Sequence, residues 1–163
     1  SSFLQSNLVL GFNLEKLTKS EMFTTLYFFD EVLCAGGLKS KIYNSLREEN
    51  QLCYSVSSIN SKYDNMYYVY VGLDKKNVPL AIKLIKKCVK DMASGKISDE
   101  EMNMAKRQLL TSLDIVRDNQ NSLINNYTFH TIVGTPLFDE LKECYKKITL
   151  NFIYELESSE EET

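Results

Sequence analysis

The sequence predicts an α+β domain whose helices pack on one face of a mostly antiparallel sheet. Two β-prone runs, 53–59 and 66–73, are separated by turn residues and read as a hairpin. Long amphipathic stretches follow that hairpin, and a hairpin beside long helices packs as two layers around one core. The chain of 163 residues is long enough for one such domain, which we expect over 1–156 before an acidic tail at 157–163.

The first half of the chain begins with a predicted strand and two helices. Residues 5–13 form a short apolar run, as in a strand. The Thr-x-x-Glu pattern beginning at Thr18 is a capping box, so a helix should start there and continue to the glycine pair Gly36–Gly37. A second helix is predicted over 38–49 and leads into the hairpin.

The clearest helix pattern in the sequence follows the hairpin. Apolar residues recur there at the spacing of one buried helix face, and four lysines fall on the opposite face. In a net-acidic chain these lysines indicate a solvated face rather than a nucleic-acid patch. The apolar stripe consists of Ala81, Leu84, Ile85, Cys88 and Met92, and the lysines are Lys83, Lys86, Lys87 and Lys90.

The rest of the chain reads as further helices and a closing strand. Gly95 ends the preceding helix, and Ser98 opens a second capping box before a long helix. A break is predicted at 118–121, followed by helices over 122–133 and 137–147 and a strand over 148–156. The inward face of the long helix is predicted to hold Met102, Ala105, Leu109, Leu113 and Val116.

Composition and charge exclude several classes of protein. The formal net charge is -3 and the pI about 5.3, which argues against a general binder of nucleic acid or anionic membranes. No apolar run approaches the roughly 18 residues that span a bilayer, and the start of the sequence lacks the features of a signal peptide. The four cysteines are scattered without a C-x-x-C motif, as in free thiols of a reducing compartment. We therefore expect a cytoplasmic location.

A catalytic metal or nucleophile has little support within this chain. Catalytic zinc needs about three protein ligands, commonly including two histidines. The sequence has one histidine, His130, so the chain by itself is expected to hold no catalytic zinc. A Ser-His-Asp or Cys-His arrangement would need the same residue. The pair Gly36–Gly37 before a helix falls far short of a phosphate-binding fingerprint.

Arg47 and Tyr54 are the residues whose chemistry remains open. They lie seven residues apart, on either side of the predicted junction between helix and strand. Both side chains donate hydrogen bonds, and two donors that converge would suit a carbonyl oxygen that gains negative charge during attack. In the alternative interpretation, Arg47 pairs with Glu48 or Glu49 and Tyr54 simply packs. The residues alone leave both open.

The stretch GGLKSKIYNSLREENQLCYSVSS, followed by a turn and MYYVYVGL, resembles a known family. It is similar to the C-terminal, non-zinc type of domain in bacterial members of the pitrilysin/insulinase family of zinc metallopeptidases, which includes the mitochondrial processing peptidase. Members carry GG-x-x-S-(R/K)-L-(F/Y)-x-x-(V/L)-R-E-K-x-x-L-A-Y-S, a hairpin, and then G-x-(I/L)-S-x-E-E-(L/M). Gly95 to Met102 matches the last piece. The resemblance covers nearly the whole chain.

The resemblance implies a shared active site. In this family, paired α+β domains enclose a chamber for peptides, and one domain carries an H-x-x-E-H zinc motif. The other domain lends an Arg and a Tyr that bind the scissile carbonyl or its oxyanion, and Arg47 and Tyr54 match them by type and spacing. The resemblance thus implies catalytic and substrate-binding roles for both residues, and places Gly36 and Gly37 with the substrate-binding segment. Zinc is expected on the partner domain, in cis or in trans.

The sequence also departs from the family pattern. The Lys-x-Gly piece is here Glu49-Asn50-Gln51, which removes a glycine from the turn and puts a carboxylate near Arg47. The expected function is peptide binding and carbonyl stabilisation within a zinc metalloendopeptidase, with no activity in the isolated chain. The alternative is a catalytically inactive partner or assembly subunit. A lone ligand-binding domain is a third hypothesis with little support.

Overall fold

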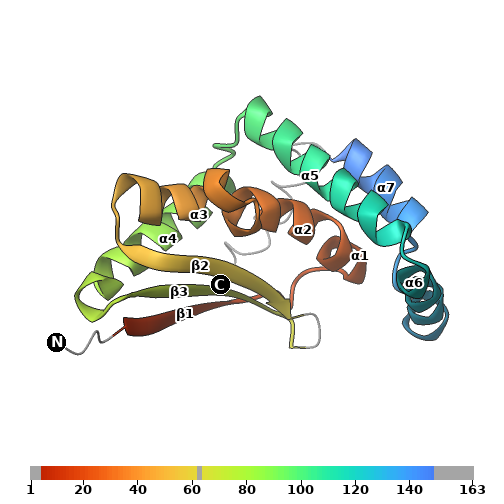
Figure 1. The fold of residues 1–163 in the computed structure, drawn as a ribbon, viewed down its shortest axis with the longest axis horizontal. Helices are drawn as coiled ribbons and strands as arrows, with labels where there is room; N and C mark the ends of the chain where they lie inside the picture. Colours follow the sequence, from red (N-terminus) through yellow and green to blue (C-terminus); the bar gives the residue numbers. More distant parts are fainter. Residues whose placement is uncertain (1–4, 62–63, 149–163) are drawn as a thin grey trace. The chain divides into compact units, whose positions relative to one another are not determined.

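The computed structural model describes residues 5–61 and 64–148, and these fall into two compact units (Figure 1). The first, here called the sheet unit, comprises Ser1–Lys16 and Val32–Lys96. The second, the helical unit, comprises Leu17–Glu31 and Ile97–Thr163. One domain over 1–156 remains a prediction, and the tail predicted at 157–163 lies outside the described residues.

The sheet unit is built on three antiparallel strands. These are β1 (Gln5–Asn13), β2 (Cys53–Ser61) and β3 (Met66–Asp74), in the order β1-β3-β2. β3 pairs with both neighbours, and its hairpin with β2 is the one predicted from the sequence. The prediction of an α+β fold with an antiparallel sheet is confirmed.

The central strand shows why one face of the sheet is covered. Successive strand residues point to opposite faces, and in β3 the residues of one face are at most 2% exposed whereas their neighbours are mostly half-buried. α3 and α4 lie over this buried face in Figure 1. The buried residues of β3 are Tyr67, Val69, Val71 and Leu73.

The helical stretch between β1 and β2 is more broken than the sequence predicts. The capping box at Thr18 is present, but the single helix expected as far as residue 35 is interrupted at Thr24, whose φ and ψ are -119° and -80°. The Thr24 hydroxyl donates to the Ser20 carbonyl at 2.8 Å, a local bond that competes with regular helix. The segments are α1 (Lys19–Phe23), α2 (Thr25–Asp30), η1 (Glu31–Ala35), η2 (Gly37–Lys39), α3 (Lys41–Tyr43) and η3 (Asn44–Glu49).

The long helix of the sheet unit follows its predicted pattern. A short turn, η4 (Lys75–Asn77), leads into α4 (Val78–Ala93), whose apolar stripe is buried apart from the half-buried Leu84. All four predicted lysines are exposed. Gly95 ends this segment with a φ of 73°, a left-handed conformation that glycine adopts readily.

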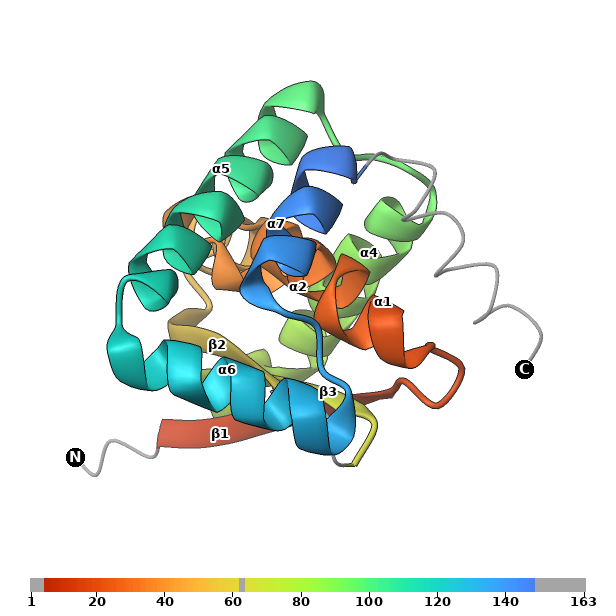
Figure 2. The same ribbon diagram turned by 90° about the vertical axis from the view of Figure 1, so that its right-hand side faces the viewer.

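The helical unit contains α5 (Asp99–Arg117), α6 (Gln120–Val133) and α7 (Phe138–Lys147). α5 begins with the predicted capping box at Ser98, and α6 ends at Gly134. Figure 2 shows α5 beside α7. Burial of Val116 was predicted but is wrong, because this side chain lies in the last turn of α5 and is 42% exposed.

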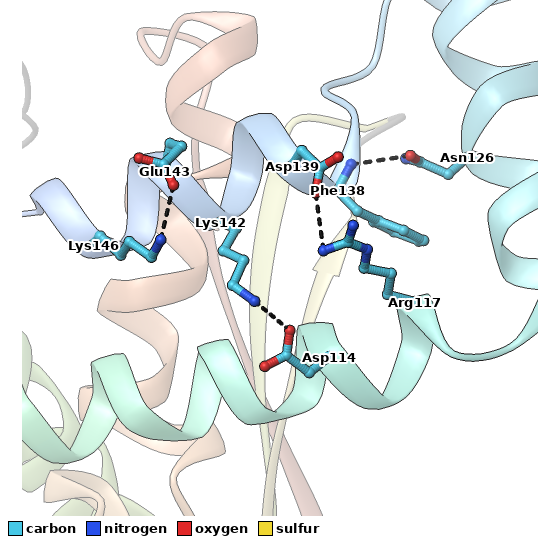
Figure 3. A network of polar contacts seen from close by, with 8 residues as sticks. All are labelled: Asp114, Arg117, Asn126, Phe138, Asp139, Lys142, Glu143 and Lys146. Carbon is cyan, nitrogen blue, oxygen red and sulfur yellow. Dashed lines mark hydrogen bonds and ion pairs between the residues drawn. The ribbon is translucent and has the colours of Figure 1, made fainter.

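Polar contacts join the elements of the helical unit (Figure 3). Lys142 of α7 binds Asp114 of α5 at 2.7 Å, and Arg117 binds Asp139 at 3.1 Å. None of the α6 side chains is buried. The strand predicted over 148–156 lies outside the described residues except for its first residue.

Candidate functional site

The junction between η3 and β2 is a tight turn. Its geometry is set by two backbone bonds: the Leu52 amide donates to the Leu46 carbonyl at 2.8 Å, and the Gln51 amide donates to the Arg47 carbonyl at 3.2 Å. Gln51 has a φ of 53°, in the left-handed region where residues other than glycine are disfavoured by about 1–2 kcal/mol. The backbone at this position therefore favours glycine, but this chain has Gln51 there.

Tyr54 occupies an irregular position in the sheet. Cys53 lies opposite Leu73, but the next paired residue of β2 is Ser55, opposite Gly72, so Tyr54 is the extra residue of a β-bulge. A bulge redirects the side chain of its extra residue. Cys53 is accordingly buried, whereas the Tyr54 side chain is 53% exposed.

Arg47 is held against Tyr54 across this junction. The Arg47 Nη1 donates to the Tyr54 main-chain carbonyl at 2.8 Å, and the guanidinium lies over the Tyr43 ring at 5.5 Å from its centroid. A cation over an aromatic face is attracted by the negative face of the ring. The structure thus brings Arg47 and Tyr54 together, with the Tyr43 ring limiting where the guanidinium can swing.

The Tyr54 hydroxyl has a different partner. It donates to Asp74 Oδ1 at 2.9 Å, and Asp74 is the last residue of β3. This hydrogen bond, followed by partial desolvation and the Asp74 charge, raises the pKa of the Tyr54 phenol. At neutral pH the phenol therefore keeps its hydrogen.

Within the described residues, the contacts of Arg47 are with the Tyr54 carbonyl and the Tyr43 ring. The Glu49 Oε1 instead accepts a hydrogen bond from the Asn44 side chain at 2.9 Å. Because both contacts are with uncharged groups, the positive charge of the guanidinium could still attract an anionic ligand.

Cys53 lies close to these groups without being reactive. Burial raises the pKa of its thiol, an effect that the Arg47 charge only partly opposes. Because the thiolate is the nucleophilic form of cysteine, a raised pKa makes Cys53 a packing residue at neutral pH.

The glycine pair lies at the other end of the helical segment. Gly37 has a φ of 67° and its carbonyl accepts a bond from the Ser40 hydroxyl at 2.8 Å. Ten residues separate Gly37 from Arg47 in the sequence. A substrate role for Gly36 and Gly37 stays a prediction.

His130 belongs to α6 in the helical unit. Its Nδ1 lies 2.7 Å from the Thr135 carbonyl, which fixes the ring at the end of the helix. Within 5–61 and 64–148, no group of three or more His, Cys, Asp or Glu side chains is arranged to hold a metal ion. The same part of the chain contains no helix long and apolar enough to cross a membrane.

Sequence reasoning missed two members of this site. Tyr43 lies four residues before Arg47, a helical spacing that brings side chains together and that identifies it in hindsight. Asp74 lies 20 residues beyond Tyr54, and only the pairing of β2 with β3 brings the two together. We call Tyr43, Arg47, Tyr54 and Asp74 the junction site.

Comparisons with known proteins agree with the fold and the motifs. A family model described as the peptidase M16 inactive domain matches residues 4–109. An uncharacterized zinc protease of Rickettsia felis is 30% identical over 117 residues, which cover 67% of this chain and 26% of that protein. Another, from Rickettsia bellii, is 26% identical over 122 residues, covering 70% of this chain and 28% of that protein. The chain spans about a quarter of the length of these relatives.

Solved structures support the same fold. A conserved protein from Enterococcus faecalis superposes with a TM-score of 0.86 at 22% identity, covering 97% of this chain and 37% of that one. The peptidase M16 inactive domain from Pseudomonas fluorescens gives 0.76 at 15% identity, covering 93% of this chain and 37% of that one. Because the family model matches more than half of the sequence, the chain belongs to the pitrilysin-type peptidase family M16, as a domain of its inactive type.

Proposed function

We propose that this chain is the non-zinc domain of a zinc metalloendopeptidase and contributes peptide binding and carbonyl stabilisation to a zinc site on another domain. Arg47 and Tyr54 would steady the carbonyl oxygen under attack. The observation that carries the proposal is the contact of Arg47 with the Tyr54 main-chain carbonyl across the junction, which ties an exposed guanidinium to the backbone of a residue whose side chain is also exposed.

The chemistry of Arg47 suits this role. Its guanidinium has five N–H donors and keeps its charge at any physiological pH, and the Tyr54 carbonyl engages Nη1. The carbonyl oxygen of a peptide becomes negative when water attacks, so a fixed cation placed there favours the transition state over the ground state. Zinc bound on the partner domain would supply the activated water.

The partner domain is inferred from length and from names. The matched relatives are described as zinc proteases, and most of their length lies outside the part that this chain matches. The donor set here does not suit catalytic zinc, because the one histidine, His130, is turned to the Thr135 carbonyl. A zinc-bearing H-x-x-E-H domain, in the same chain or in a separate one, is therefore the partner that we propose.

The test is hydrolysis of a fluorogenic peptide by the assembled protein, with the zinc-bearing domain present. Arg47→Ala and Tyr54→Phe should each lower kcat by about 10²–10³-fold, as does the loss of one oxyanion donor elsewhere. Arg107→Ala and Tyr127→Phe are matched controls, since both residues are exposed on the helical unit. The isolated chain should not hydrolyse the peptide. Unchanged kcat/KM in both junction variants would defeat the assigned roles.

A second candidate is an inactive partner subunit retained for assembly. Gln51 favours this candidate, because it stands where the family commonly has glycine and adopts a left-handed conformation. The sequence of the full-length gene and of its neighbouring genes distinguishes the two hypotheses. An intact H-x-x-E-H motif in the same protein favours the enzyme, whereas its absence there leaves a dependent partner or a scaffold.

A cytoplasmic location is part of the same proposal. Cys34, Cys53 and Cys88 are buried and take part in no disulfide, as in proteins of a reducing compartment. Cell fractionation tests this location directly, and recovery of the protein outside the cytoplasm would contradict it.

A further inference from the structure

We propose that Asp74 restrains Tyr54 by accepting the hydrogen bond of its hydroxyl, so that a substrate carbonyl must displace Asp74 as the acceptor before Tyr54 can act. This inference rests on the proposed function, because it concerns how the same site changes when a peptide arrives. It assigns to Asp74 a role as a competing acceptor, which the spacing of Arg47 and Tyr54 does not suggest.

The Tyr54 hydroxyl can donate only one hydrogen bond at a time. A tyrosine hydroxyl has one hydrogen to donate, and in this structure that hydrogen is directed to Asp74 Oδ1 at 2.9 Å. As long as this bond persists, Tyr54 offers a ligand only its lone pairs. A carbonyl oxygen, which is itself an acceptor, therefore gains nothing from Tyr54 until the bond is exchanged.

The backbone makes the contact a property of the fold. Tyr54 is the extra residue of the bulge between Cys53 and Ser55, and these neighbours pair with Leu73 and Gly72. Asp74 follows Leu73 as the last residue of the same strand. The bulge thus sets the exposed phenol beside the end of β3.

The charges of the site explain why the restraint holds at rest. A carboxylate accepts a stronger hydrogen bond than a neutral oxygen does. Arg47 does not relieve this charge in the recorded contacts, since its Nη1 is directed to the Tyr54 carbonyl. The hydrogen bond to Asp74 is also the leading cause of the raised pKa of the Tyr54 phenol.

The two donors of the junction site therefore differ in readiness. The Arg47 guanidinium contacts uncharged groups, so its charge can act on a substrate carbonyl directly. The Tyr54 hydroxyl must first break its hydrogen bond to Asp74. When the carbonyl oxygen becomes negative, it is a charged acceptor like the Asp74 carboxylate and can compete with it for the Tyr54 hydroxyl. The exchange of partner is thus favoured most in the transition state, which is when a donor raises kcat.

The test compares Asp74→Asn with wild type in the assembled, zinc-bearing protein. Asparagine keeps the size of the side chain but presents a neutral acceptor, so the phenol is released more easily. We expect kcat/KM to rise between about twofold and tenfold, the usual net worth of one hydrogen bond. In a Tyr54→Phe background the same substitution should change nothing. Asp64→Asn is the matched control, because Asp64 is an exposed acceptor for the Ser61 hydroxyl on the same hairpin.

A second readout does not depend on hydrolysis. In NMR titrations of the protein labelled at the tyrosine Cζ, the Tyr54 signal, assigned by its loss in Tyr54→Phe, should titrate at lower pH in Asp74→Asn. An unchanged titration would overturn the inference, as would an unchanged kcat/KM or an equal gain in the Tyr54→Phe background. Loss of activity in Tyr54→Phe without a gain in Asp74→Asn would reject the restraint by Asp74 but keep the proposed role of Tyr54. Full activity in Tyr54→Phe removes the proposed role of Tyr54, and the restraint falls with it.

Discussion

The junction site and the helical unit use charged side chains in different ways. In the helical unit, charges meet opposite charges: Asp114 binds Lys142, and Arg117 binds Asp139 (Figure 3). At the junction site, Arg47 binds a neutral carbonyl and Asp74 binds a neutral hydroxyl, although Lys96 and Asp91 elsewhere in the sheet unit form an ion pair at 2.7 Å. Charges that are paired within the protein are already compensated, whereas the charges at the exposed junction site are available to a ligand.

The two units also differ in what they bury. Ile85 on α4 is 0% exposed in the sheet unit, whereas Ile124 on α6 is 63% exposed in the helical unit. Burial of apolar area is the main source of stability, so equal substitutions in the two helices should have unequal effects. Paired substitutions in α4 and α6 therefore test the contrast between the two units most directly.

The largest expected effect is that of Ile85→Ala. Removing this buried side chain should lower the free energy of unfolding by about 2–5 kcal/mol, because it deletes packed methyl groups and leaves a cavity. Ile124→Ala should change the free energy by less than about 0.5 kcal/mol, since its side chain is already in water. Urea unfolding of both variants measures the difference. Similar losses in the two would show that α6 is covered and that the contrast is wrong.

Gln51→Gly should stabilise the sheet unit. Gln51 is held at a φ of 53°, and glycine removes the steric conflict of that conformation while adding freedom to the unfolded chain. We expect a net gain of about 0.5–1 kcal/mol in the free energy of unfolding. Asn50→Gly at the adjacent residue should lower stability instead, because its φ of -115° does not favour glycine and its side-chain amide donates to the Ser45 carbonyl at 2.7 Å. A loss of stability in Gln51→Gly would mean that the Gln51 side chain holds the turn.

Tyr145 tests the helical unit through pH. Its side chain is 5% exposed and its hydroxyl donates to the Phe23 carbonyl at 3.4 Å. Burial raises the pKa of this phenol, so the folded state keeps the proton that the unfolded state loses above about pH 10. Stability should therefore fall as pH rises past 10, and Tyr145→Phe should remove this part of the fall. Thermal unfolding of both proteins between pH 8 and 11 measures the effect. An equal loss of stability in wild type and Tyr145→Phe would contradict the assignment.

Asp114→Asn should have the smallest effect. The hydrogen bond and charge of Lys142 lower the pKa of the Asp114 carboxyl, so the pair stabilises the fold above the unfolded pKa and is lost as pH falls below it. Because the pair is exposed to solvent, the change in Tm at pH 7 should be slight and should shrink further in salt. A drop as large as that of Ile85→Ala would place this contact in the core of the helical unit.

Periodicity and caps predicted most of the fold. The stripe from Ala81 to Met92 and the capping boxes at Thr18 and Ser98 are local patterns, and the structure contains each of them. The break at Thr24 and the exposure of Val116 were not foreseen. The break depends on competition from a side-chain hydrogen bond, and the exposure of Val116 depends on where α5 itself ends. The periodic pattern of apolar residues encodes neither.

The junction site was predictable only in part. The spacing of Arg47 and Tyr54 identified both residues, and the family resemblance gave them a target. The bulge at Tyr54 and its bond to Asp74 arise from strand register, which joins residues distant in sequence. A sequence pattern that identifies donors therefore leaves unknown which acceptor holds them at rest.

The most direct measurement is steady-state hydrolysis by the assembled, zinc-bearing protein carrying Arg47→Ala and Tyr54→Phe together. If both donors act on the attacked carbonyl, kcat should fall by at least about 10²-fold while KM changes little, the pattern of an interaction made in the transition state. The same fall with Arg107→Ala and Tyr127→Phe would mean that the loss is not specific to the junction. A kcat equal to that of wild type would contradict the central claim and leave the chain as an assembly partner.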